Sequence, residues 1–214
     1  MSTTHQDLVH PELAGVHVAE ESGDLSRGEV ILKGALAAGA VYGTLMAGPF
    51  VRRALAMSGG GDVDILNFAL TLEYLESTFY AEAMKRAGAK GELKKLVSLL
   101  ASDEKQHVEA LEATIKKLGG KPVKEPRFDF EYSDTAGFLR LARTFEDTGV
   151  SAYNGAAPRI KSKEVLAAAG SIVQVEARHA AAIRLQDDEA PAPTAFDPSL
   201  EEARVLKAVK PFIA

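Results

Sequence analysis

Two stretches of this sequence place a glutamate and a histidine three residues apart among apolar side chains. The stretch "VEARHAA" contains Glu176 and His179, and "DEKQH" contains Glu104 and His107. Residues three apart lie on one face of an α-helix, about 4.5 Å apart along its axis. On a buried face, an unpaired carboxylate or imidazole is strongly destabilising. Such a pair is satisfied either by a hydrogen-bonded network or by a metal ion that both side chains bind.

The polar residues recur along the chain as an internal repeat. Two further apolar stripes each carry a glutamate followed seven residues later by a tyrosine, and these residues are Glu73, Tyr80, Glu146 and Tyr153. Corresponding members of the repeat are 72 or 73 positions apart. The pattern therefore predicts two helical hairpins with one polar set, in which every helix brings a glutamate to its inward face.

Four carboxylates in one core of low dielectric constant would repel one another, so some would have to bind protons. Two divalent cations would neutralise four carboxylates, and two imidazoles would complete the coordination with nitrogen. Oxygen and nitrogen ligands without sulfur suit iron(II) or manganese, and zinc is an alternative. The residue types favour a two-metal site, and two metal-free Glu–His networks are the alternative interpretation.

One position departs from the repeat. Glu76 shares a helix face with Glu73 and is a candidate extra ligand, whereas its counterpart in the second hairpin is Gly149. The small residue at 149 could instead leave room for O₂ or peroxide beside the metals. Either tyrosine taken alone could equally be an ordinary core residue whose hydroxyl is hydrogen-bonded.

Four helical segments are needed to position these residues. Their expected ranges are 62–88, 91–118, 134–157 and 162–188, with Asp62 and Ser162 as N-caps. Met84 is expected on the inward face of the first segment. Short turns join the segments, except for one longer, proline-containing crossing, "KPVKEPRFDFEY". Helices of these lengths with such connections predict a four-helix bundle.

The complete pattern resembles the ferritin-like superfamily of carboxylate-bridged di-iron proteins. The stretches "LNFALTLEYLESTFYAEA", "PRFDF" and "VEARHAA" are similar to bacterial ferritin-like domain proteins, including the desiccation-related group, over about residues 62–214. The expected fold is an all-α, ferritin-like antiparallel four-helix bundle with one longer crossover, preceded by an N-terminal apolar helix.

The resemblance also implies a role for each member of the repeat. Glu73 and Glu146 would be terminal ligands, Glu104 and Glu176 would bridge two iron ions, and His107 and His179 would each bind one ion. Tyr80 and Tyr153 would donate hydrogen bonds that orient the carboxylates.

The resemblance leaves the function open between two classes. An oxidoreductase of the ferroxidase or rubrerythrin-like peroxidase type would oxidise iron(II) with O₂ or peroxide, in iron handling or in oxidative or desiccation stress. In a non-catalytic stress protein, the metals would mainly stabilise the bundle. An iron-storage cage is disfavoured, because the apolar N-terminal stretch would be awkward on a cage and the proline-rich tail is short for a further long helix.

Composition and charge exclude other function classes. The 214 residues carry a formal net charge of −5 and contain no cysteine, which excludes disulfides and thiolate metal sites. The negative charge is concentrated in residues 1–29, so the remaining chain is electrically balanced. A balanced body with an acidic tail lacks the basic surface that nucleic-acid binding requires.

The N-terminal region divides into two parts ahead of the expected bundle at 62–189 and the C-terminal tail at 190–214. Residues 1–29 are expected to be a disordered acidic tail. Residues 30–57 include an uncharged run, and "SRGEVILKG" resembles a twin-arginine export signal in which Gly28 replaces one arginine.

Three interpretations of the apolar segment are open: an export signal cleaved near residue 56, a membrane anchor, or a helix packed on the bundle or on a partner. The first two slightly favour the cell envelope over the cytoplasm, with the membrane or export machinery as partner of residues 26–56. A homodimer is also compatible with the sequence.

Overall fold

The computed structural model describes residues 60–86 and 88–214, and this part of the chain is all-α. Its long helices are α2 (Gly60–Arg86), α3 (Gly91–Lys117), α4 (Thr135–Ala156) and α5 (Lys163–Gln186). They agree with the four predicted segments to within two residues at each end. The predicted acidic tail at 1–29, the apolar segment at 30–57 and the apolar helix expected there lie outside the described residues.

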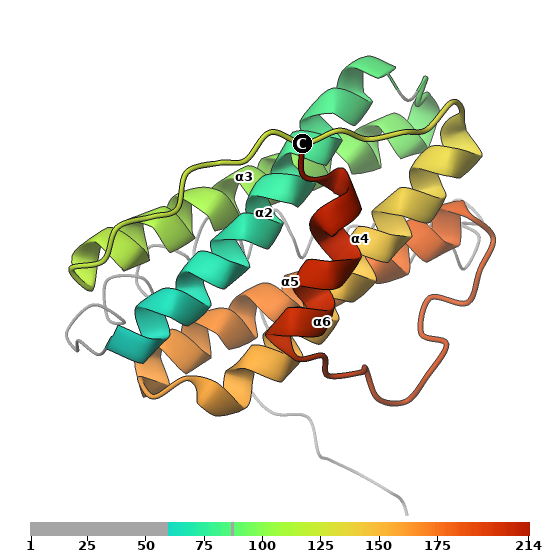
Figure 1. The fold of residues 1–214 in the computed structure, drawn as a ribbon. Helices are drawn as coiled ribbons and strands as arrows, with labels where there is room; N and C mark the ends of the chain where they lie inside the picture. The colour runs from blue at the N-terminus through green and yellow to red at the C-terminus, as the bar shows by residue number, and fades with distance from the viewer. Residues whose placement is uncertain (1–59, 87) are drawn as a thin grey trace, which may run out of the picture.

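The long helices form a bundle of two hairpins (Figure 1). Helix α2 packs along α3, and α4 packs along α5. Contacts of α2 with α4 and of α3 with α5 join the two hairpins. The connection from α3 to α4 runs the length of the bundle, so neighbouring helices are antiparallel throughout (Figure 1). In the described part of the chain, none of the helices combines the length and apolar character needed to span a bilayer.

The crossover between α3 and α4 is attached to α2 by polar and apolar contacts. Asn67 of α2 donates a hydrogen bond to the carbonyl of Lys121 (3.2 Å) and accepts one from the amide of Val123 (2.8 Å). Further along the crossover, Phe130 is buried, and its ring centroid lies 5.1 Å from that of Phe79. The crossover therefore covers a flank of α2 that would otherwise face solvent.

This covering explains why Met84 is exposed, at 41%, although the apolar stripe predicted it inside. At the end of α2, the face next to the crossover carries Phe79, Ala83 and Arg86. The ring centroids of Phe79 and Tyr132 are 5.8 Å apart, and the Arg86 guanidinium lies 5.0 Å from the Tyr132 ring centroid. Ala83 is thus the buried residue of the last turn, and Met84 points away from the covered face.

The helix starts of α2 and α5 are joined by one carboxylate. Ser162 caps α5 as predicted, by accepting a hydrogen bond from the amide of Val165 (3.2 Å). Asp62 was predicted to cap α2 but lies within its first turn. Its buried carboxylate accepts hydrogen bonds from the amides of Lys161 (2.9 Å) and Ser162 (2.8 Å). Asp62 therefore stabilises the turn that precedes α5.

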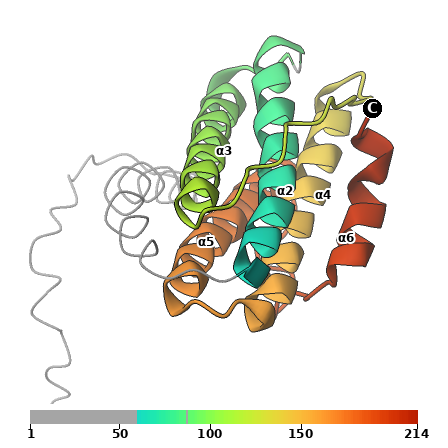
Figure 2. The same ribbon diagram turned by 60° about the vertical axis from the view of Figure 1, so that its left-hand side comes forward.

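The C-terminal residues form a short helical segment on the outside of α4 (Figure 2). It consists of α6 (Glu202–Val209) and the 3₁₀ turn η3 (Lys210–Phe212); another 3₁₀ turn, η2 (Ala157–Arg159), ends α4. Val205 and Val209 of α6 are buried. Where the chain approaches α4, a Cβ on Gly155 would lie 1.9 Å from the carbonyl oxygen of Leu200. Only glycine allows this close approach.

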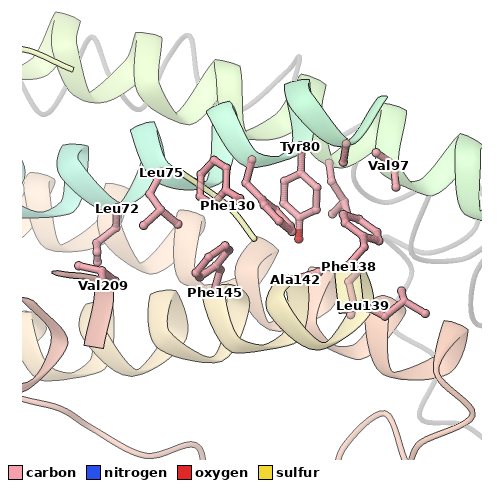
Figure 3. Packing of buried hydrophobic residues seen from close by; sticks show 14 of the residues in the cluster. Leu72, Leu75, Tyr80, Val97, Phe130, Phe138, Leu139, Ala142, Phe145 and Val209 are labelled. Atoms are coloured by element: carbon pink, nitrogen blue, oxygen red, sulfur yellow. The ribbon is translucent and has the colours of Figure 1, made fainter. Parts of the chain in front are cut away.

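Two clusters of buried apolar side chains fill the bundle. The aromatic cluster includes Phe79, Tyr80, Phe130, Phe138 and Phe145, and it extends to Val209 of α6 (Figure 3). The aliphatic cluster includes Leu70, Leu111, Ile115, Tyr153 and Ile172. On α3, Leu100 belongs to the first cluster and Leu111 to the second. The Glu–His pair of α3 lies between these two leucines.

Candidate metal centre

The four glutamates and two histidines singled out by the repeat come together inside the bundle. The four glutamates have no exposed surface, and His179 is 4% exposed. His107 lies closest to solvent, with 11% of its side chain exposed. Glu73 comes from α2, Glu146 from α4, and each Glu–His pair from α3 or α5.

The six residues form two groups of four, each gathered around one imidazole. The His107 position consists of Glu73, Glu104, His107 and Glu176; Nδ1 of His107 lies 3.2, 3.0 and 3.0 Å from oxygens of these three glutamates in that order. The His179 position consists of Glu104, Glu146, Glu176 and His179; Nδ1 of His179 lies 2.8, 3.5 and 3.7 Å from the three glutamates. In each group, one candidate ligand atom per residue lies within 4.8 Å of all the others.

Glu104 and Glu176 belong to both groups. The two imidazole centroids are 6.3 Å apart, so the two positions are neighbours that share a pair of carboxylates. Each hairpin supplies three of the four residues of one position, and the other hairpin supplies the fourth. Two adjacent cations bridged by carboxylates would have this distribution of ligands.

Unpartnered polar atoms give a direct test of whether a metal fits. Among the described residues, the buried atoms without a hydrogen-bond partner include Oε1 of Glu104, Oε2 of Glu146, both carboxylate oxygens of Glu176 and Nδ1 of His179. Nδ1 of His179 and Oε1 of Glu104 are 2.8 Å apart but are not aligned for a hydrogen bond. Since buried polar groups are almost always paired, these oxygen and nitrogen atoms fit divalent cations such as iron(II), manganese(II) or zinc(II).

Burial and mutual repulsion control protonation of the outer carboxylates. Burial, reinforced by the charge of Glu176, raises the pKa of Glu73 to about 8. Burial also raises the pKa of Glu146 well above its usual range, although His179 opposes the change. In the absence of a cation, these two carboxyl groups therefore retain protons at pH values where an exposed glutamate is ionised.

The two shared glutamates behave differently because each faces both imidazoles. Burial acts to raise the pKa of Glu104, but His107 and His179 outweigh it and lower the pKa below its usual range. The pKa of Glu176 is also lowered by the two imidazoles, against burial and the charge of Glu104. Correspondingly, the carboxylates raise the pKa of both histidines, although burial opposes this. Without metal, protonated imidazoles thus neutralise the shared carboxylates.

The two repeated tyrosines each donate a hydrogen bond to an outer glutamate. Tyr80 on α2 donates to Oε1 of Glu146 on α4. Tyr153 on α4 donates to Oε1 of Glu73 on α2 at 2.5 Å. Both tyrosines are buried. Each bond restrains one oxygen of an outer carboxylate.

The structure changes the interpretation of Gly149. A Cβ at this residue would lie 3.2 Å from Oε1 of Glu76. The space beside Gly149 therefore receives the Glu76 carboxylate, and it is not the open room for O₂ or peroxide that the sequence suggested. Glu76 is 2% exposed, its Oε1 lacks a partner among the described residues, and burial raises its pKa well above the usual range.

Sequence reasoning missed one buried carboxylate of the site. Asp103 is 6% exposed, and its Oδ2 lies 3.3 Å from Nε2 of His179. Asp103 lies seven residues after Leu96 and three after Leu100, in phase with these buried leucines, so helical periodicity could have indicated its burial. Its counterpart in the repeat, Val175, is apolar, and a position-by-position comparison of the hairpins could have drawn attention to it.

Comparison with known families agrees with this architecture. The sequence profile of a ferritin-like domain matches residues 61–187. This range includes all four long helices of the bundle apart from Gly60, the first residue of α2. No curated protein has a sequence that matches the chain.

Proposed function

This chain belongs to the ferritin-like domain family, and from that premise we propose that its buried cluster binds two iron ions and that the protein is an oxidoreductase. The proposed reaction is oxidation of iron(II) with O₂ or peroxide as the electron acceptor. Manganese and zinc satisfy the same ligand types, so elemental analysis of the native protein decides which metal is bound.

One observation carries the proposal: two four-residue groups share Glu104 and Glu176. A single structural ion would need only one of these groups. Two iron(II) ions would each give up one electron and become iron(III), and these two electrons, with two protons from solvent, convert O₂ to hydrogen peroxide or hydrogen peroxide to two water molecules. The shared glutamates are therefore the residues on which a reaction of two metals depends.

The residues of the cluster would have different roles in binding the two ions. Glu104 and Glu176 would bridge the ions, while Glu73 with His107 and Glu146 with His179 would complete the two positions. Tyr153 and Tyr80 hold one oxygen of Glu73 and Glu146, which leaves the other oxygen of each carboxylate for a metal. Glu76 would be a further ligand or proton carrier.

The surroundings restrict what can reach the cluster. The aromatic and aliphatic clusters lie on either side of it along α3 and α5. His107, with 11% of its side chain exposed, is the member of the cluster closest to solvent. Molecules as small as O₂ or hydrogen peroxide are the reactants that suit so enclosed a site.

A structural role for the metals is the second candidate, and the unpartnered buried atoms favour it. Removing cations from this core leaves polar atoms without partners, so bound metal would stabilise the bundle even without turnover. In this case, chelation would lower the melting temperature strongly, but the loaded protein would not react with oxidant.

Anaerobic titration with iron(II), followed by O₂ or peroxide, separates the two candidates. The catalytic proposal expects about two iron(II) ions per chain and a ferric absorption band after oxidant is added. Glu104→Gln should abolish both, whereas Glu109→Gln, an exposed change on the same helix, should leave them intact. Iron that binds but stays ferrous in the presence of oxidant would leave only the structural role.

A further inference from the structure

Apart from Glu76 and Gly149, the two halves of the cluster differ at Asp103 and its repeat counterpart, Val175. Nε2 of His179 donates a hydrogen bond to Oδ2 of Asp103, at 3.3 Å, and both side chains are buried. In the repeat, the residue that would play this part for His107 is Val175, whose side chain has no polar atom. The contacts of His107 with the carboxylates of the cluster all involve its Nδ1.

A carboxylate behind a ligand imidazole has a defined effect. It accepts the proton on the far nitrogen, which fixes the tautomer, holds the ring in place and leaves the near nitrogen basic. For His179, this keeps the lone pair of Nδ1 directed at the metal position. His107 has no such carboxylate from its repeat partner and would have to be ordered when the metal binds.

Exposure differs in the same direction. The side chain of His179 is 5% exposed and that of His107 is 11% exposed. The ion beside His179 would therefore be enclosed by a buried, oriented ligand, while the ion beside His107 would lie nearer to solvent. Both differences favour tighter metal binding and slower metal exchange at the His179 position.

We propose that the two metal positions are inequivalent: the His179 position, oriented by Asp103, binds its ion first and retains it, and the His107 position binds second and exchanges. The inference rests on the two-metal function proposed above. Because two-electron reduction of an oxidant needs both ions, occupancy of the His107 position would then determine whether the centre is active. The chain would react only when the metal supply fills the weaker position.

Cobalt(II) binding, followed by calorimetry and visible absorption, tests this on the full chain. His107→Ala leaves the His179 position with its full ligand set, and His179→Ala leaves the His107 position. The first variant should bind cobalt(II) more tightly than the second. Asp103→Asn should weaken binding about 10- to 100-fold in the His107→Ala background. In the His179→Ala background, Asp103→Asn should change binding by no more than about twofold, because its target is absent.

A general structural effect of Asp103→Asn would weaken binding equally in both backgrounds and would overturn the inference. So would two identical cobalt(II) affinities in the wild-type chain, although the proposed function would survive that result. A wild-type chain that binds no metal would remove both proposals. As a gain-of-function arm, Val175→Asp should tighten binding in the His179→Ala background, and unchanged affinity in a folded variant would count against the role given to the carboxylate.

Discussion

Tyr80, in the first hairpin, donates a hydrogen bond to Glu146 in the second. In the opposite direction, Tyr153 in the second hairpin donates a hydrogen bond to Glu73 in the first. The pairing is crossed: each hairpin orients a carboxylate that belongs to the other. The hydrogen bonds thus join α2 to α4, where the two hairpins meet, and couple their docking to the geometry of the buried Glu–His cluster.

Removing either hydroxyl should destabilise the protein and affect one metal position more than the other. Tyr80→Phe leaves a buried oxygen of Glu146 unpaired, which should lower the free energy of unfolding by about 1–3 kcal/mol and weaken mainly the His179 position. Tyr153→Phe should act mainly on the His107 position. Urea unfolding and metal titration measure the two effects.

Tyr132→Phe is the matched control for these variants. The Tyr132 hydroxyl is buried without a hydrogen-bond partner among the described residues. Removing it should leave the free energy of unfolding unchanged or raise it, because no bond is lost. Equal destabilisation by all three substitutions would mean that the hydroxyl bonds to Glu73 and Glu146 contribute nothing specific.

Metal removal should lower thermal stability even though no residue changes. A ligand that binds only the folded chain at 100 times its dissociation constant stabilises it by about 2.7 kcal/mol per site. Scanning calorimetry of metal-free and loaded protein should therefore show a melting temperature that rises with free metal concentration. In the Glu176→Gln variant, metal should raise the melting temperature far less, because both metal positions include this carboxylate.

The stability of the metal-free chain should fall as pH rises. Glu73 has a pKa near 8 in the folded chain, against 4.5 for the ordinary group, so it binds its proton more tightly when folded. The contribution of Glu73 to the free energy of unfolding is fully present below about pH 4.5 and is lost as the pH rises toward about 8. The raised pKa values of His107 and His179 act with the same sign above their ordinary 6.5. The lowered values of Glu104 and Glu176 act oppositely, but below pH 4.5.

Melting temperatures of metal-free protein between about pH 5 and pH 8 check this. Glu76→Gln should reduce the loss at high pH, because it replaces a buried carboxyl group of raised pKa with a neutral amide of similar shape. Metal should stabilise the protein more at the upper end of the range, since the bound ligands are deprotonated. A metal-free protein whose stability rises with pH would contradict the electrostatic description.

Docking of the C-terminal segment should depend on Gly155. In Gly155→Ala, the new Cβ would meet the Leu200 carbonyl oxygen, so the segment before α6 must shift, at a cost of about 1–3 kcal/mol or more. Gly170→Ala is the control: a Cβ there meets nothing within 4 Å, and alanine should stabilise α5 by up to about 1 kcal/mol. Thermal unfolding of both variants gives the comparison.

The bundle and the gathering of its polar residues could be predicted because both depend on periodicity within single helices. The repeat of Glu104 with His107 and of Glu176 with His179 is such a pattern. Which glutamate each tyrosine would bind could not be predicted, because the pairing depends on how α2 and α4 face each other. Met84 was misplaced because the buried flank of α2 is determined by the crossover, a segment distant in sequence.

Asp103 illustrates a different limit. It is in phase with the buried Leu96 and Leu100 of its own helix, but nothing in that helix identifies the partner of its carboxylate. Only the approach of α5 brings the ring of His179 within 3.3 Å of its carboxylate. Asp62 is similar, since its partners at Lys161 and Ser162 are about a hundred residues away along the chain. Contacts of this kind depend on tertiary packing.

The sharing of Glu104 and Glu176 between the two positions has a consequence for the chain as a polymer. Ions bound as proposed would join two residues 72 positions apart in a chain that contains no cysteine. They would act as a cross-link that closes a long loop, comparable to a disulfide in reach. Unlike a disulfide, this link can form only after the hairpins have docked, and a chelator rather than a reductant opens it. The tether between the two halves would then depend on the supply of metal.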